Sequence, residues 1–130
     1  TVSLNVFAED ISVTLNGNNI VFEDAKPIIY NDRTLIPIRA VFEKANCYVD
    51  WDSKNNMAVI GNEEKVIFIL INSEKMKVYD IVKDEENEID LDVPAMIVDE
   101  STMIPLRAVG EALGAKVEWN QRSNTVSLSI

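Results

Sequence analysis

The sequence contains an internal repeat, because residues 28–60 align without a gap with residues 96–128, 68 positions later. Eleven of the 33 aligned pairs are identical. Among the identical pairs are Thr34/Thr102, Ile36/Ile104, Pro37/Pro105, Arg39/Arg107, Ala40/Ala108, Val41/Val109, Glu43/Glu111, Val49/Val117 and Trp51/Trp119. A self-match at a fixed period indicates a duplicated structural unit, so a fold proposed for this chain has to contain one arrangement twice.

Composition places the chain among ordinary globular proteins. Its 130 residues, 47% hydrophobic and 26% charged, suit one domain or two small intertwined halves. The longest apolar run, residues 66–71, has the length of a strand, so we expect no membrane span. The net charge of −10 argues against nucleic acid, anionic lipid and anionic cell-wall polymers as partners. The single cysteine, Cys47, is expected to be a buried structural thiol.

The first eight residues are uncharged and end in Val-Phe-Ala, which is typical of the tail and cleavage site of a secretory signal peptide. We therefore interpret residues 1–8 as a signal-peptide remnant, and residues 9–130 as the domain itself. An edge strand through Val2, Leu4 and Val6 is the alternative interpretation of the same segment.

Alternating apolar residues and turn signals predict several strands. A hairpin is expected over residues 11–22, with its turn at Asn16-Gly17, the strongest turn signal in the chain. Further strands are expected at 28–30, 33–36, 48–51, 57–60, 66–71, 76–82, 89–93, 116–119 and 125–130. The stretch 83–88 is expected to be an acidic loop. The two related units then run over about 11–62 and 63–130.

Two short helices are predicted where the apolar period changes from two to about 3.6. Pro37 and Pro105 are expected at the first helical position, where a missing N–H is tolerated. The inner faces would carry Ile38, Val41, Phe42 and Ala45 in the first copy and Leu106, Val109 and Leu113 in the second. Asn46 and Gly114 suit the left-handed residue that ends a helix. Each helix is about nine residues long, too short to be stable without tertiary packing.

The repeated segments resemble a known family. Thr-Leu-Ile-Pro-Ile-Arg-Ala-Val-Phe-Glu (34–43) is followed by Val49 and Trp51, and Thr-Met-Ile-Pro-Leu-Arg-Ala-Val-Gly-Glu-Ala-Leu-Gly-Ala (102–115) by Val117 and Trp119. Both are very similar to the copper amine oxidase N-terminal-like domain, also called the stalk domain, and the resemblance covers about residues 11–130. It implies an α+β fold, mainly antiparallel β-sheet curled around two short helices. It also implies a module of secreted or cell-surface proteins of Gram-positive bacteria.

The function implied by this resemblance is not enzymatic. A copper amine oxidase centre needs histidine ligands and a quinone made from tyrosine, and this chain has no histidine, so we expect neither a metal nor a cofactor. We expect a structural spacer or protein-interaction module at the bacterial cell surface. The alternative is a module that binds cell-wall or extracellular glycan. The partners would be other surface proteins or glycan, and the oligomeric state stays open.

Arg39 and Arg107 stand two residues after the prolines, where a cation opposes the helix dipole, so another interaction must favour them. Pairing with Glu43 and Glu111 at i+4, or with a strand acid such as Asp50 or Glu118, is the structural interpretation, and it is the preferred one. Binding of a ligand carboxylate is the functional one.

Trp51 and Trp119 alternate with acidic neighbours, which predicts that both indoles point into the core. Sugar stacking is the alternative for these two side chains.

The acidic stretch offers a weak candidate calcium loop, made of Asp84, Glu86, Glu88 and Asp90. Its spacing is not that of a loop that wraps the ion. A solvated loop that protects a strand edge from pairing is the preferred interpretation.

Overall fold

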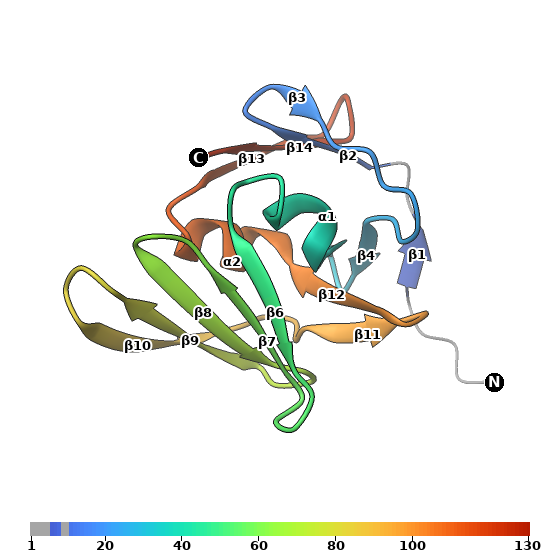
Figure 1. Ribbon diagram of the computed structural model, residues 1–130. Coiled ribbons are helices and arrows are strands. Elements are labelled where there is room, and N and C mark those ends of the chain that lie inside the picture. Colours follow the sequence, from blue (N-terminus) through green and yellow to red (C-terminus); the bar gives the residue numbers. More distant parts are fainter. Residues whose placement is uncertain (1–5, 9–10) are drawn as a thin grey trace.

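The computed structural model describes residues 6–8 and 11–130. These residues form three sheets that surround two short helices (Figure 1). The central sheet has the order β1-β4-β5-β12-β11, with β1 Val6–Ala8, β4 Ile28–Tyr30, β5 Arg33–Pro37, β11 Met96–Val98 and β12 Ser101–Pro105. The meander sheet has the order β10-β9-β8-β7-β6, with β6 Tyr48–Asp52, β7 Met57–Gly61, β8 Lys65–Leu70, β9 Lys75–Asp80 and β10 Glu85–Asp90. The mixed sheet has the order β13-β14-β2-β3, with β2 Ser12–Leu15, β3 Asn18–Asn19, β13 Lys116–Asn120 and β14 Thr125–Ser129.

This architecture confirms the predicted fold class, because the strands are mostly antiparallel and the helices are two and short. The elements of the two aligned segments also recur with the spacing of the sequence repeat. Strands β4, β5, β6 and β7 begin 68 residues before β11, β12, β13 and β14, and the helices α1 (Ile38–Phe42) and α2 (Leu106–Ala112) begin 68 residues apart. The two segments therefore fold alike, while their origin by duplication stays a prediction.

Both helices begin one residue later than predicted. Pro37 and Pro105 end their strands and serve as N-caps, with extended ψ angles of 125° and 115°. The φ that the proline ring imposes suits an extended residue as well as a helical one, which is why the sequence alone did not separate these positions. The left-handed conformation predicted after each helix is confirmed, since Asn46 has a φ of 60° and Gly114 a φ of 92°.

The helix of the first copy is also shorter than predicted. It ends at Phe42, and the chain continues in turns closed by hydrogen bonds from Ala45 N–H to the carbonyl of Phe42 and from Asn46 N–H to that of Glu43. Five residues are too few for a helix that is stable alone, so α1 is held by the core against which Ile38, Val41 and Phe42 pack.

The two units exchange their outer strands. The hairpin β2–β3 precedes the first repeat, but β2 pairs in parallel with β14 of the second, with Val13 beside Val126. Strands β8, β9 and β10 precede the second repeat, but β8 pairs with β7 of the first. The Asn16-Gly17 turn of β2–β3 is confirmed, with positive φ at both residues. Neither unit can therefore complete its sheets without the other.

The pairing of β5 with β12 joins the units at the centre. Ile36 lies opposite Ile104, and these are equivalent positions of the repeat. Pro37 lies opposite Met103, the repeat equivalent of Leu35, and Leu35 lies opposite Pro105, the repeat equivalent of Pro37. An antiparallel pair with this register has a local two-fold axis at Ile36 and Ile104, both of which are fully buried.

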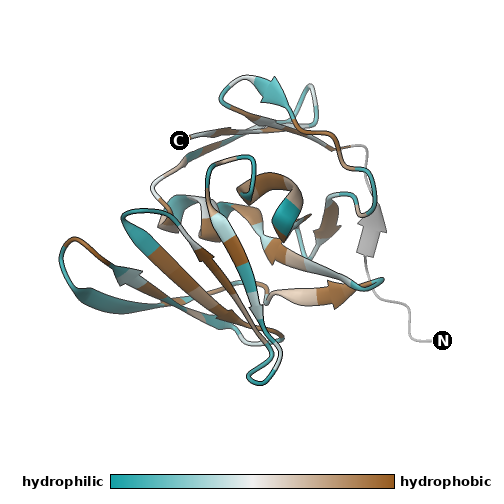
Figure 2. Ribbon diagram, in the orientation of Figure 1, coloured by the Kyte–Doolittle hydropathy of each residue, from teal (hydrophilic) through white to brown (hydrophobic). Residues whose placement is uncertain are grey.

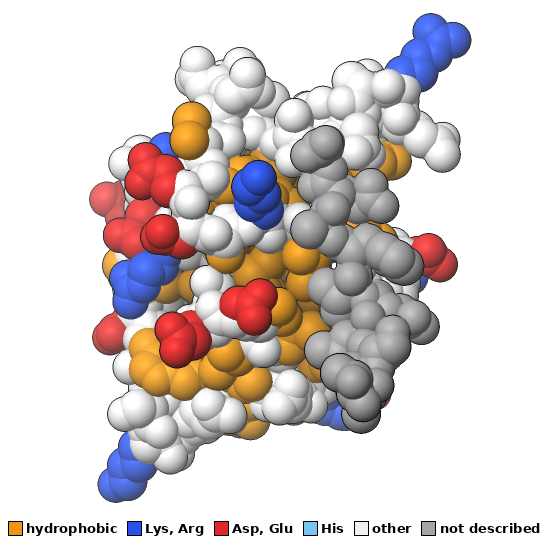
Figure 3. All heavy atoms as spheres, turned by 90° about the vertical axis from the view of Figure 1, so that its right-hand side faces the viewer, with side chains coloured by type: hydrophobic (Ala, Val, Ile, Leu, Met, Phe, Trp, Pro, Cys, Tyr) orange, Lys and Arg blue, Asp and Glu red, His pale blue; other side chains and the backbone are white. Residues whose placement is uncertain are grey.

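The main core lies between the sheets and includes both helices. It contains side chains from all three sheets, among them Ile36, Ile60, Ile69, Ile104, Val13 and Leu128. Figure 2 shows the corresponding apolar colouring on the helices and on the strands around them. A second, smaller cluster of Ile28, Leu35, Val93 and Met103 lies apart from it. Figure 3 shows hydrophobic side chains gathered on the side of the molecule that carries β1, β4 and β11.

The acidic stretch is a strand and not the predicted loop. β10 covers residues 85–90 and pairs with β9 along its whole length, from Glu85 opposite Asp80 to Asp90 opposite Lys75. The strand predicted at 89–93 is therefore placed several residues too late. Acidic residues have low strand propensity, but the cross-strand partners on β9 decide the conformation.

The amino-terminal prediction falls partly outside the described residues. Residues 1–5 are not among the described residues. Strand β1 pairs with β4 at the edge of the central sheet, with Phe7 opposite Ile29. The signal-peptide remnant stays a prediction.

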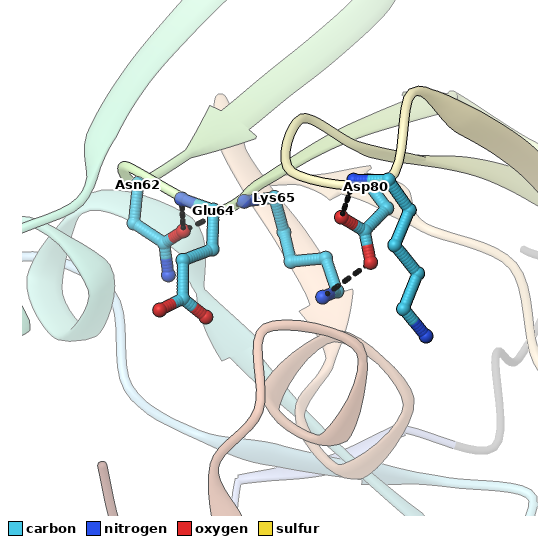
Figure 4. Close-up of polar contacts among 5 residues, drawn as sticks. Asn62, Glu64, Lys65 and Asp80 are labelled. Atoms are coloured by element: carbon cyan, nitrogen blue, oxygen red, sulfur yellow. Dashed lines mark hydrogen bonds and ion pairs between the residues drawn. The ribbon is translucent and has the colours of Figure 1, made fainter.

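One ion pair lies at the end of the meander sheet. Among the described residues, Asp80 is the charged residue that is buried. Its Oδ2 accepts a hydrogen bond from Lys65 Nζ at 3.0 Å (Figure 4). Its Oδ1 accepts from Lys83 N–H at 3.0 Å. Asn62 Oδ1 closes the adjoining turn by accepting from the backbone N–H groups of Glu64 and Lys65. The hydrogen bonds from Lys83 and Lys65 lower the pKa of Asp80.

We expect Asp80→Asn to lower the melting temperature at pH 7 and to weaken its dependence on acid. A carboxyl whose folded pKa is depressed contributes stability that is complete above its unfolded pKa of about 3.9 and is lost as pH falls through the lower folded pKa. Thermal melts from pH 7 to pH 2 followed by circular dichroism measure this. Glu63→Gln, exposed in the adjoining turn, is the control and should melt like the parent protein. An equally steep acid dependence in Asp80→Asn would contradict the assignment.

Ile104→Ala is expected to lower the free energy of unfolding by about 2–5 kcal/mol, because Ile104 is fully buried at the junction of the two units. Ile97→Ala, the same change on β11 at a side chain that is 50% exposed, should cost less than about 1 kcal/mol. Urea denaturation of both variants measures the difference. Equal costs would show that the β5–β12 junction is not where stability is concentrated.

Candidate functional site

The described residues form an open groove of about 1090 Å³. Its walls come from both units: the β4–β5 turn, the end of β10 with the segment after it, α2 and β13. Apolar side chains that line it include Ile29, Leu91, Leu106, Ala108, Val117 and Val126. Polar side chains that line it are Asp32, Arg33, Thr34, Asp90, Asp92, Arg107, Glu111 and Gln121, and Trp119 adds an aromatic wall. An apolar groove with a few convergent polar groups is the usual form of a binding site for a small or extended ligand.

The two tryptophans are not core residues, so the prediction that both indoles are buried is wrong. Trp51 is 37% exposed and Trp119 is 41% exposed. They lie opposite Ala58 and Val126, which are buried, so each indole is on the core side of its sheet. However, β6 and β13 are edge strands, and a side chain at an edge lacks a neighbour on one side. Of the two, Trp119 lines the groove.

The two arginines make the same internal contacts, as the repeat predicted. Arg39 Nη1 lies 3.4 Å from Glu43 Oε1 and donates to the carbonyl of Val49 at 3.3 Å. Arg107 Nη1 lies 3.4 Å from Glu111 Oε2 and donates to the carbonyl of Val117 at 3.1 Å. Each guanidinium therefore ties its helix to the following edge strand.

The surroundings of the arginines differ. Arg107 and Glu111 line the groove beside Trp119, whereas Arg39 and Glu43 are not among its lining residues. The repeat thus provides two copies of one local structure, of which the second faces the groove.

A second guanidinium lines the groove at the start of β5. Arg33 Nη2 and Nε donate to Asp92 Oδ2 at 2.8 and 3.0 Å. Both side chains are largely exposed, so this pair contributes at most about 1 kcal/mol to stability. Its effect is to present a carboxylate and a guanidinium together at the rim. The sequence does not reveal this pair, because 59 positions separate the two residues and no local pattern connects them.

The candidate calcium residues lie along β10 and its preceding turn, not in a loop around a point. Lys75 Nζ lies 3.1 Å from Glu88 Oε1 and 3.6 Å from Asp90 Oδ1, so those two carboxylates already share a cation. Asp84 accepts a hydrogen bond from the Tyr79 hydroxyl, which raises the pKa of Tyr79. Among the described residues, no group of three or more His, Cys, Asp or Glu side chains is arranged to hold a metal ion.

Cys47 is buried, as predicted, at 6% exposure. Burial raises the pKa of its thiol, which keeps the sulfur protonated and unreactive. Its Sγ contacts the carbonyl of Ala45 at 3.7 Å, so this residue has a packing role at the end of the α1 segment.

We expect Arg39→Ala and Arg107→Ala to lower the free energy of unfolding by similar amounts, each about 1 kcal/mol. Each removes one hydrogen bond to a carbonyl and one exposed ion pair, which contribute little individually. Urea denaturation of the two variants side by side measures this. A large difference between them would mean that the shared contacts are not the main role of one arginine.

The described residues contain no helix that is long and apolar enough to cross a membrane. A search of curated proteins and a search of solved structures found no match. A profile of the copper amine oxidase N-terminal domain family matches residues 14–128, which covers both repeats and the strands between them. The chain therefore belongs to the copper amine oxidase N-terminal domain family, a non-catalytic accessory domain.

Proposed function

We propose that this chain is a structural module of the bacterial cell surface that binds a neutral cell-wall glycan in its groove. The observation that carries the proposal is the position of Trp119, which is 41% exposed and forms a wall of the groove. A half-exposed indole has an apolar face available for the apolar face of a sugar ring, while the buried part of the side chain keeps the ring rigid.

The polar groups of the groove support a ligand rich in hydroxyl and amide groups. Arg107, Arg33 and Gln121 supply N–H donors, and Asp92 and Glu111 supply acceptors. Ion pairs hold Arg33 against Asp92 and Arg107 against Glu111, so these four side chains lose little conformational freedom when a ligand binds.

Charge favours a neutral glycan over an anionic one. Four acids, Asp32, Asp90, Asp92 and Glu111, line the groove against two arginines. The whole chain carries a net charge of −10. A polyanion would be repelled by both, whereas sugar hydroxyl and acetamido groups would not.

A spacer or protein-interaction module without a glycan ligand is the competing function. The intertwined frame, in which the two units complete each other's sheets, supports a mechanical role of this kind. Secretion to the cell surface belongs to both proposals and rests on the uncharged amino-terminal segment and on the family resemblance.

We expect the protein to sediment with purified peptidoglycan at moderate salt, and Trp119→Ala to weaken this binding roughly tenfold or more, which corresponds to about 1.4 kcal/mol of lost stacking. Trp51→Ala is the matched control, because Trp51 has the same position in the repeat and similar exposure but does not line the groove. Arg107→Ala against Arg39→Ala repeats the comparison for a polar contact.

Two results would overturn the glycan proposal. One is absence of peptidoglycan binding by the parent protein, which would leave the spacer or protein-interaction function. The other is equal weakening by Trp119→Ala and Trp51→Ala, which would mean that the groove is not the binding site. Binding that disappears in moderate salt would show an ionic contact in place of stacking.

A further inference from the structure

The open edge of β13 borders the groove. Even-numbered residues at β14 pair with β2, because the carbonyls of Asn124 and Leu128 accept hydrogen bonds from N–H groups on the β2 side. The odd-numbered residues of β14 therefore face β13, and their partners there are even-numbered. The main-chain N–H and C=O groups of Val117 and Trp119 consequently point away from β14, toward the open edge. Arg107 lines the groove and donates to the Val117 carbonyl on this edge at 3.1 Å, so the groove lies along it.

The two copies of the repeat differ at the tryptophan N–H on this edge. In the first copy, Trp51 N–H donates to Asp50 Oδ1 at 2.8 Å, so the carboxylate of the preceding residue occupies it. In the second copy the preceding residue is Glu118, whose Oε1 lies 3.1 Å from Lys116 Nζ. Trp119 N–H forms no hydrogen bond within the described residues. The second copy thus leaves one main-chain donor open at a residue that lines the groove.

The open edge is too short to pair with a peptide strand. Val117 is 6% exposed, and its carbonyl is occupied by Arg107. Strand β13 ends at Asn120, where the turn to β14 begins. A peptide that extends a sheet pairs over several residues, whereas this edge presents one accessible residue, Trp119. A single N–H donor suits a ligand with an isolated carbonyl group.

The lining of the groove narrows the identity of that carbonyl. Four acids against two arginines disfavour a carboxylate or a phosphate as the acceptor, whereas a neutral amide carbonyl is not repelled. An acetamido group on a sugar ring supplies such a carbonyl together with a methyl group. Val117, Val126 and Ala108 give the groove apolar surface that this methyl can contact.

We propose that the groove selects N-acetylated sugars, whose acetamido carbonyl accepts a hydrogen bond from Trp119 N–H while the sugar ring stacks on the indole. This selectivity rests on the glycan function proposed above and adds the chemical group that the groove recognises. Sugars with a hydroxyl group in that place lack both the carbonyl and the methyl, so they bind more weakly.

Isothermal titration calorimetry with two trisaccharides tests the selectivity. Triacetylchitotriose and cellotriose share one β-linked glucose backbone, and differ in carrying an acetamido or a hydroxyl group at the second carbon of each ring. We expect triacetylchitotriose to bind the parent protein about tenfold more tightly, the effect of one added hydrogen bond and the methyl contact. N-acetylated trialanine amide, a short extended peptide, is the third probe and should bind most weakly.

The outcomes separate this selectivity from the glycan function itself. Equal affinities for the two trisaccharides would overturn the selectivity and leave the glycan function in place. The same follows if triacetylchitotriose does not bind a protein that sediments with peptidoglycan. Tighter binding of the peptide would assign the edge to strand pairing. The glycan function has its own test, sedimentation with peptidoglycan, and fails if that binding is absent.

A pair of substitutions that makes the second copy resemble the first tests the donor. Lys116→Gln/Glu118→Asp removes the ion pair and introduces the shorter carboxylate that covers the tryptophan N–H in the first copy. We expect this double variant to bind triacetylchitotriose no better than cellotriose. Its affinity for cellotriose should be unchanged, because neither residue lines the groove and the indole is untouched. Circular dichroism checks that the variant is folded.

Two controls make the variant test specific. Lys116→Gln alone removes the ion pair but keeps the glutamate, so the preference for triacetylchitotriose should persist. Asp50→Ala opens the equivalent N–H of Trp51, which does not line the groove, and should change neither affinity. A double variant that keeps the preference, or an Asp50→Ala variant that loses it, would overturn the assignment of Trp119 N–H as the donor.

Discussion

The pairing of β5 with β12 is the contact on which the rest of the structure depends. It joins equivalent strands of the two repeats about Ile36 and Ile104, which are fully buried. Each of these strands runs directly into a helix, so the pairing also brings α1 and α2 together inside the sheets. The first strands of each unit then lie next to the last hairpin of the other unit. For this reason β2 pairs with β14, and β8 pairs with β7. Removing the junction would separate two halves whose sheets are both incomplete.

The repeated residues make the same local contacts in both copies. The segments outside the repeats make the surroundings of the two copies differ. Arg39 and Arg107 tie helix to strand with nearly the same geometry. Only the second copy meets the β4–β5 turn and the end of β10, and these make the groove beside Trp119. Strand β10 has no close counterpart in the first unit, where the short β3 follows the Asn-Gly turn. The groove therefore depends on segments outside the repeat.

The predictions from sequence were most accurate where the conformational preference of single residues decides the local structure. The Asn16-Gly17 turn and the left-handed Asn46 and Gly114 follow from which residues tolerate a positive φ. The predictions failed where a neighbour distant in sequence decides. β10 is a strand because β9 pairs with it, despite its acids. Trp119 is half-exposed because β13 happens to be an edge, which its own alternation with acidic residues does not reveal.

The sequence by itself determined the family, most of the strands, the helix positions to within a few residues, and the absence of histidine chemistry, since these depend on residue type and on short-range order. Only the tertiary structure decided which strands share a sheet and which copy of each repeated side chain faces a groove. It also decided which apolar strand residues are left facing outward. Arg33 and Asp92 illustrate the reason: 59 residues apart, they meet because the start of β5 in the first unit packs beside the segment that follows β10 in the second. A contact of that kind depends on how the sheets assemble, and no local pattern encodes it.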